Sequence, residues 1–171
     1  IGIGQKWHFS KKIYWCYNFL KQCNHKIIIF TDAYDVFYLH NIKEIKHRFI
    51  KMNVDILWSA EKYYSHQLEK DKAFYENIGI GEYRYLNSGG VIGYTKKLLE
   101  FYENLIDNIQ NNKLFFETLK MHGCKCRGTK ANCDQQYISH FISNNYTKFN
   151  LKLDYSCEIF YVAVKDWNNI N

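Results

Sequence analysis

Proline is absent from this sequence, and arginine occurs only at positions 48, 84 and 127, against 20 lysines. No stretch approaches the roughly 18 uncharged apolar residues of a membrane-spanning helix, so the sequence predicts no transmembrane segment. Residues 1–6 also lack the pattern of a signal peptide. Scarce arginine beside abundant Asn, Ile and Tyr is typical of an A/T-rich genome, such as that of a protist or a large DNA virus.

Length and composition predict one globular domain that spans residues 1–171. Hydrophobic residues make up 47% of the chain and charged residues 23%, values that a disordered chain does not have. The formal charge of +6 would allow binding to nucleic acid. However, the lysines are scattered without a run of like charge, and no nucleic-acid-binding motif occurs. We therefore expect a solvated basic surface and no nucleic-acid partner.

The six cysteines allow two interpretations. Cys124, Cys126 and Cys133 lie close to His122, and three cysteines with a histidine would suit zinc. Their spacing is not that of a standard zinc finger, so we favour a surface loop with one disulfide in an oxidising compartment. Cys16 and Cys23 are predicted to lie on one helix, where they could not bond to each other.

Hydrophobic periodicity predicts alternating helices and strands. The expected helices are 9–23, 41–52, 96–110 and 134–143. The expected strands are 26–31, 54–59, 151–153 and 158–162, with a turn and short strand in 85–94 and an irregular segment over 63–81. The strand–helix–strand order indicates a parallel α/β sheet, with 26–31 and 54–59 buried on both faces.

Two carboxylates directly follow the first predicted strand, in the segment IIIFTDAYDVFY. Asp32 and Asp35 would lie at the carboxyl edge of the sheet, where open α/β sheets bind ligands. Two such carboxylates can share one Mn²⁺ or Mg²⁺ ion, which also binds phosphate oxygens. Alternatively, they are ordinary turn residues, since Asp is common in turns.

Two further segments carry candidate site residues. Small residues in Asn87-Ser88-Gly89-Gly90 would let the backbone approach a sugar, and the Asn amide offers donors and an acceptor. The alternative is a tight turn into a strand. Asp134 is either the N-cap of the helix that it begins or an acidic residue that contacts a ligand.

Six blocks in this chain resemble the glycosyltransferase domain of the procollagen lysyl hydroxylase family and its procollagen galactosyltransferase-like relatives. They occur in the family's order, with similar spacing, across nearly the whole chain. The blocks are GQK (4–6), TDAYDV (31–36), SAE (59–61), YLNSGGVIGY (85–94), DQQY (134–137) and LDYSCEIF (153–160). The resemblance implies an α/β fold of the GT-A type, a UDP-sugar donor and Mn²⁺.

The resemblance also assigns roles to residues near the nucleotide. Asp32 and Asp35 would be the metal ligands, and Tyr34 would contact the nucleotide. Lys6 would lie near the donor diphosphate. Phe9 matches a family aromatic position and would pack on the uracil; the alternative is that Phe9 only packs against the first helix.

By the same resemblance, Asn87 and Asp134 would orient the donor sugar as catalytic residues. Ser88, Gly89 and Gly90 would line the donor site.

The chain departs from the family pattern at several places. Tyr64–His66 stand where lysyl hydroxylases carry Cys-Trp-Pro, and Ala131–Cys133 replace an acidic run before Asp134. The His-x-Asn-Gly motif with a third metal ligand and the first strands of a GT-A fold do not occur. The resemblance therefore implies a GT-A core that is incomplete at both ends and part of a longer protein.

The leading hypothesis is a Mn²⁺-dependent hexosyltransferase. It would move glucose or galactose from UDP-glucose or UDP-galactose to a hydroxyl of hydroxylysine in a collagen-like protein, or to a glycan. The alternative is an inactive module that binds nucleotide sugar or glycan. Family analogy places such a domain in the secretory lumen, whereas a viral origin would allow other locations.

Overall fold

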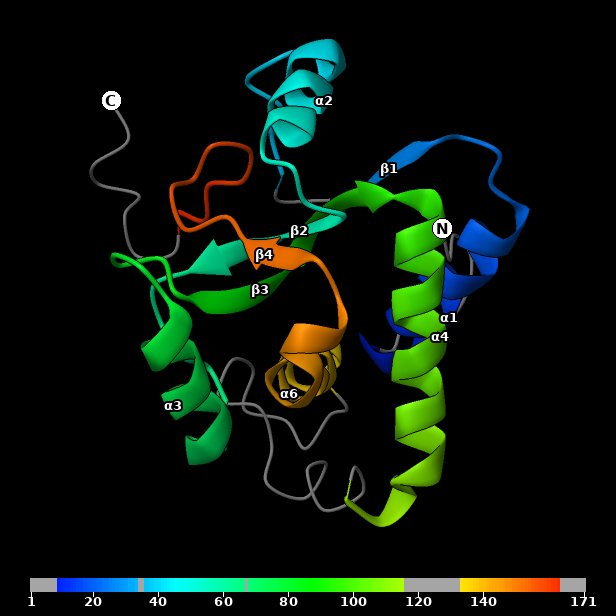
Figure 1. Cartoon of the computed structure of the whole chain (residues 1–171), viewed down its shortest axis with the longest axis vertical. Helices are drawn as coiled ribbons and strands as arrows, with labels where there is room; N and C mark the ends of the chain where they lie inside the picture. Colours follow the sequence, from blue (N-terminus) through cyan, green and yellow to red (C-terminus); the bar gives the residue numbers. More distant parts are fainter. Residues whose placement is uncertain (1–8, 34–35, 67, 116–132, 164–171) are drawn as a thin grey trace.

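The computed structural model describes residues 9–33, 36–66, 68–115 and 133–163. In chain order the elements are α1 (Phe9–Gln22), β1 (Ile27–Thr31), α2 (Ile42–Lys51), β2 (Ile56–Glu61), α3 (Glu69–Ile78), β3 (Tyr85–Tyr94), α4 (Thr95–Asn111), α6 (Asp134–Asn145), a 3-10 turn (Tyr146–Lys148) and β4 (Leu151–Leu153). Figure 1 shows their arrangement around the sheet.

The sheet has the strand order β1-β3-β2-β4. β3 runs antiparallel to both of its neighbours, β1 and β2, whereas β4 pairs with β2 in parallel. Three of the four strands therefore run in one direction, and the α/β class is confirmed. The expectation that β1 and β2 would form a purely parallel sheet is wrong in one respect, because the reversed strand β3 lies between them.

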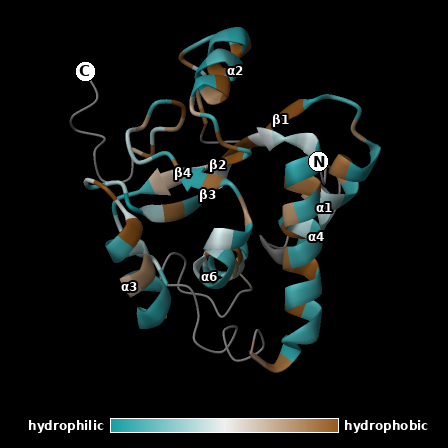
Figure 2. Cartoon of the chain, in the orientation of Figure 1, coloured by the Kyte–Doolittle hydropathy of each residue, from teal (hydrophilic) through white to brown (hydrophobic). Residues whose placement is uncertain are grey.

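Helices cover both faces of the sheet. On one face, α1, α3, α4 and α6 enclose the larger core, whose central rings include Trp58, Phe101 and Tyr102. On the other face, α2 packs Ile45 and Phe49 against the sheet. Figure 2 shows hydrophilic and hydrophobic residues alternating along α4, as expected of a helix with one buried face.

Strand burial follows from position in the sheet. Every residue of the central strand β2 is buried, as its apolar run predicts. Every residue of β1 is only half-buried, because β1 lies at the edge of the described sheet. The expectation that β1 is buried on both faces is therefore wrong.

The four predicted helices are present with nearly the predicted bounds, but two other segments differ. The segment 63–81 contains α3, which begins with four charged residues and yet buries two side chains, Asp71 and Tyr75. The predicted strand 158–162 is not formed. Its first three backbone N–H groups instead donate to the Asp154 carboxylate, at 2.7–2.9 Å.

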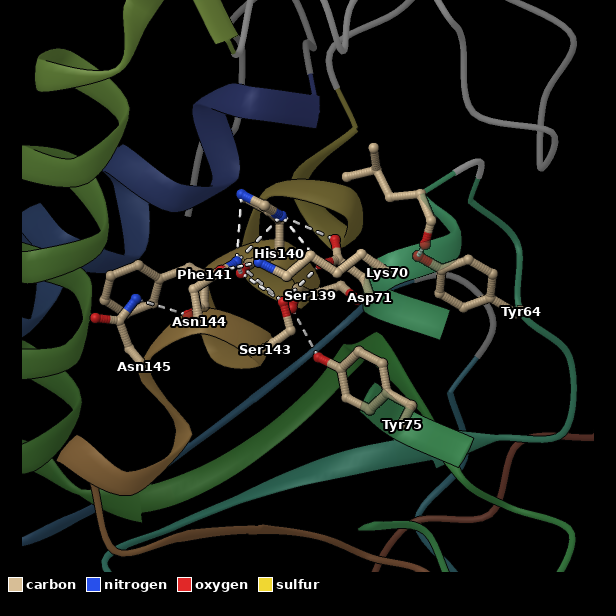
Figure 3. A network of polar contacts seen from close by, with 11 residues as sticks. Tyr64, Lys70, Asp71, Tyr75, Ser139, His140, Phe141, Ser143, Asn144 and Asn145 are labelled. Atoms are coloured by element: carbon tan, nitrogen blue, oxygen red, sulfur yellow. Dashed lines mark hydrogen bonds and ion pairs between the residues drawn. The ribbon is translucent and has the colours of Figure 1, made fainter. Parts of the chain in front are cut away.

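A buried polar network joins α3 to α6 (Figure 3). Ser143 Oγ donates to Asp71 Oδ1 at 2.7 Å, and His140 Nδ1 lies 2.9 Å from Asp71 Oδ2. Tyr75 Oη donates to the Ser139 carbonyl at 2.9 Å. These contacts fix the position of α6, whose first turn enters the site described below.

No helix among the described residues is long and apolar enough to cross a membrane. The cysteines in this part of the chain, Cys16, Cys23, Cys133 and Cys157, are all free thiols. Cys124 and Cys126 lie outside the described residues, so the expected disulfide stays a prediction.

Candidate functional site

The site is built on an irregularity in β3. Asn87 of β3 pairs with Ser59 of β2, and Val91 pairs with Trp58, the neighbour of Ser59. The three residues between Asn87 and Val91 therefore have no partner on β2 and form a bulge. We call Ser88–Gly90 the β3 bulge. The predicted turn into a short strand is thus a bulge inside one long strand.

The β3 bulge is attached to the end of β1. Gly90 pairs with Thr31, and the backbone N–H of Asp32 donates to the Gly89 carbonyl at 2.9 Å. A Cβ atom on Gly89 would lie 2.8 Å from Asn87 Oδ1 and 3.2 Å from Asp32 Oδ2. Only glycine therefore fits here without a shift of neighbouring atoms, which explains the residue type.

Asn87 holds the bulge with both ends of its amide. Its Oδ1 accepts the Gly89 N–H at 2.9 Å, and its Nδ2 donates to Glu61 Oε2 at 3.1 Å. One N–H of the amide has no hydrogen bond to another described residue. Asn87 thus shapes the backbone of the site and ties it to β2.

Glu61 links β2 to α6 through partly buried hydrogen bonds. Its Oε1 accepts from Ser65 Oγ at 3.1 Å and from Gln135 Nε2 at 2.8 Å. Gln135 Oε1 in turn accepts the Ser88 backbone N–H at 3.0 Å. Burial raises the pKa of the Glu61 carboxyl, and the hydrogen bonds to it only partly offset that rise.

Lys12 of α1 brings the acidic residues together. Its Nζ lies 2.7 Å from Asp32 Oδ1, 2.7 Å from the Ser88 carbonyl oxygen and 3.5 Å from Asp134 Oδ2. Burial lowers the pKa of Lys12, but the carboxylates of Asp134 and Asp32 outweigh that effect, so the pKa is raised. The ammonium thus remains charged in the site.

Asp134 is not a helix cap. The N-cap of α6 is Cys133, and Asp134 is the first residue of the helix. Its side chain is 6% exposed, and Oδ2 accepts no hydrogen bond from the described residues. Burial raises the pKa of Asp134, against the opposing effects of Lys12 and the Ser88 side chain. The capping alternative is wrong, and the buried Oδ2 has the Lys12 ammonium at 3.5 Å as its charged neighbour.

The segment after β4 covers the other side of the bulge. A Cβ atom on Gly90 would lie 2.6 Å from Cδ1 of the Phe160 ring. The Phe160 backbone N–H donates to Asp154 Oδ2 at 2.7 Å. Asp154 therefore fixes the ring that closes this side of the β3 bulge.

Comparison with known proteins places the chain in a family. The sequence model of the PLOD GT domain matches residues 2–138. The chain belongs to the PLOD GT domain family. Membership in this family supports the assignment of a glycosyltransferase domain with an α/β fold of the GT-A type.

Three relatives illustrate the extent of the similarity. Procollagen-lysine,2-oxoglutarate 5-dioxygenase 2 of Mus musculus is 30% identical over 139 residues, which cover 78% of this chain and 15% of the relative. An uncharacterized protein of Acanthamoeba polyphaga mimivirus is 28% identical over 138 residues, 72% of this chain and 30% of the relative. The multifunctional procollagen lysine hydroxylase and glycosyltransferase LH3 of Rattus norvegicus is 28% identical over 106 residues, 55% of this chain and 14% of the relative. The chain thus spans less than a third of the length of these proteins.

The PLOD GT domain gathers most of the predicted site residues that the structure describes. Those that meet around the β3 bulge are Asp32, Asn87, Ser88, Gly89, Gly90 and Asp134. Lys6, Tyr34 and Asp35 lie outside the described residues, as does the side chain of Phe9. Their roles stay predictions.

Three residues with a polar contact to a predicted site residue were not themselves predicted. Glu61 and Gln135 lie in the SAE and DQQY blocks, so the resemblance to the family contained the signal for them. Lys12 is one of 20 lysines and lies in a segment whose pattern indicates only a helix. Its role follows from contacts with residues distant in sequence.

The described residues suit a divalent cation in their chemistry. Asp32 is 46% exposed, and Lys12 engages only its Oδ1. The buried Asp134 carboxylate lies near it, on the other side of the shared Lys12 ammonium. Oxygen ligands of this kind suit Mn²⁺ and Mg²⁺. Among the described residues, no three Asp, Glu, His or Cys side chains lie close enough together to hold one metal ion. Asp35 is not one of the described residues.

Proposed function

We propose that this PLOD GT domain is a Mn²⁺-dependent hexosyltransferase that uses UDP-glucose or UDP-galactose. The observation that carries the proposal is the convergence of Asp32, Asn87 and Asp134 on the β3 bulge. The family assignment supports the reaction class. The rat relative is named as a glycosyltransferase as well as a hydroxylase.

Each part of the site would contribute a separate effect. Mn²⁺, when bound at Asp32 and Asp35, supplies a Lewis acid that stabilises the charge on departing UDP. The absence of side chains at Gly89 and Gly90 lets Asn87, Asp32 and Phe160 pack against the β3 bulge, which would hold the two polar side chains around the donor. Asp134, whose Oδ2 lies in an ion pair with Lys12 but accepts no hydrogen bond from the described residues, would accept one from a sugar hydroxyl, and Asn87 would donate one.

The acceptor we propose is a hydroxyl on a collagen-like protein, either hydroxylysine or a sugar attached to it. Several relatives are named as procollagen lysine dioxygenases, and the rat relative is named as both hydroxylase and glycosyltransferase. A glycan is the alternative acceptor, and the assay below tests both.

The test measures Mn²⁺-dependent release of UDP from UDP-glucose and UDP-galactose. Asp32→Ala should lower the rate by about a hundredfold, since a metal ligand contributes several kcal/mol to leaving-group stabilisation. Asp107→Ala, which removes an exposed carboxylate from α4, is the matched control and should retain the rate.

Unchanged UDP release by Asp32→Ala would contradict the proposed metal site. Binding of UDP-sugar by the wild-type chain without any release, with collagen peptides or glycans present, would instead favour the inactive binding module. Calorimetric titration of the wild-type chain with UDP-glucose measures this binding.

A further inference from the structure

The Lys12 ammonium occupies the centre of the acidic site. It contacts an oxygen from the end of β1, the β3 bulge and the first turn of α6: Asp32 Oδ1, the Ser88 carbonyl and Asp134 Oδ2. Its side chain is 17% exposed. In the described part of the chain, no other cationic side chain forms an ion pair with Asp32 or Asp134.

We propose that Lys12 is a built-in counter-cation, which holds Asp32 and Asp134 together before metal binds and competes with the divalent metal for Asp32. Lys12 is thus a positioning residue that sets metal affinity. This inference rests on the proposed function, because it requires a divalent metal at Asp32.

The first half of the proposal follows from the burial of charge. Asp134 is almost fully buried and lies near the like charge of Asp32. An unpaired buried carboxylate is strongly unfavourable unless a cation or a proton neutralises it. Lys12 supplies that positive charge from within the fold, so the site can assemble without metal.

The second half follows from the position of the ammonium on Asp32. At 2.7 Å, Nζ already uses Oδ1, and a divalent ion at the same carboxylate would repel it. The Ser88 carbonyl and Asp134 provide other acceptors, so the ammonium can leave Asp32 and stay in the site. Metal binding therefore includes the cost of replacing this ion pair.

The experiment compares the wild-type chain with Lys12→Met, Lys12→Arg and Lys96→Met. Met keeps a long unbranched side chain without the charge, and Lys96→Met removes the same charge from an exposed position on α4. Thermal unfolding is measured without metal and with MnCl₂, and Mn²⁺ binding is measured by calorimetry.

Without metal, Lys12→Met should melt several degrees below the wild type, whereas Lys12→Arg and Lys96→Met should stay close to it. With MnCl₂, Lys12→Met should gain more in melting temperature than the wild type. Its dissociation constant for Mn²⁺ should be about tenfold lower, which corresponds to about 1.4 kcal/mol.

An equal Mn²⁺ effect on wild type and Lys12→Met would overturn this inference alone and leave the proposed function standing. No Mn²⁺ effect on either protein would overturn both. If Lys12→Met does not fold, the double variant Lys12→Met/Asp134→Asn removes the buried charge as well and should fold again. Failure of the double variant to recover would overturn the counter-cation role.

Discussion

The Phe160 ring lies against the backbone of Gly90, so closely that a Cβ atom there would come within 2.6 Å of the ring. The two residues are 70 positions apart in the sequence. Their contact seats the segment after β4 on the β3 bulge, and it requires glycine at position 90.

Gly90→Ala should therefore lower the free energy of unfolding by about 1–3 kcal/mol, the usual effect of overpacking. It should also weaken binding of UDP-sugar, because the bulge must shift. Urea unfolding and calorimetry measure the two effects. In a Phe160→Ala background the clash is absent, so Gly90→Ala should then have a much smaller effect on stability. Equal effects in both backgrounds would contradict the assigned contact.

Asp154→Ala should destabilise the chain by about 2–4 kcal/mol. The carboxylate is buried and accepts the backbone N–H groups of Glu158, Ile159 and Phe160, so its loss leaves donors unsatisfied. Asp154→Asn keeps one acceptor oxygen and should lose less. Urea unfolding measures which of the two variants loses more stability. A smaller loss for Ala than for Asn would show that the hydrogen bonds are not the cause.

Asp71→Ala should also destabilise the chain by about 2–4 kcal/mol, because it removes the shared partner of Ser143 and His140 between α3 and α6. A double-mutant cycle with Ser143→Ala measures the coupling. Since Ser143 donates directly to Asp71, the two losses should be less than additive. Additive losses would mean that this hydrogen bond contributes little.

Acid should destabilise the chain through His66. Burial lowers the pKa of His66 from its usual 6.5 to about 4, so the unfolded chain binds a proton that the folded chain does not between these values. Stability is unaffected by this group above about pH 6.5 and falls as pH decreases towards 4. The loss is on the order of 3 kcal/mol, given 1.36 kcal/mol per pKa unit.

His66→Gln is the matched variant for this effect, because Gln is polar but does not titrate. Its stability relative to the wild type should rise as pH falls from about 6.5 to 4. Urea unfolding across this range measures the difference. A constant difference between the two proteins would show that His66 is not the acid-sensitive group.

The sequence alone predicted the features that depend on local pattern. Helices α1, α2 and α4 follow from apolar residues that recur on one face, and β2 follows from a continuous apolar run. The helix α6 was predicted from Asp134 as a helix-start residue. The family blocks identified the segments that carry Asp32, Asn87 and Asp134. α3 was missed because its first four residues, Glu69–Lys72, are all charged and its buried residues include the charged Asp71.

Only the tertiary structure decided how these segments combine. The insertion of β3 between β1 and β2, and the bulge that results from their register, depend on pairings between distant strands. Lys12 meets Asp32 and Asp134 across 20 and 122 residues of sequence. A lysine on a helix has the same local pattern whether it faces solvent or two carboxylates, because its partners are set by packing and not by its neighbours in the chain.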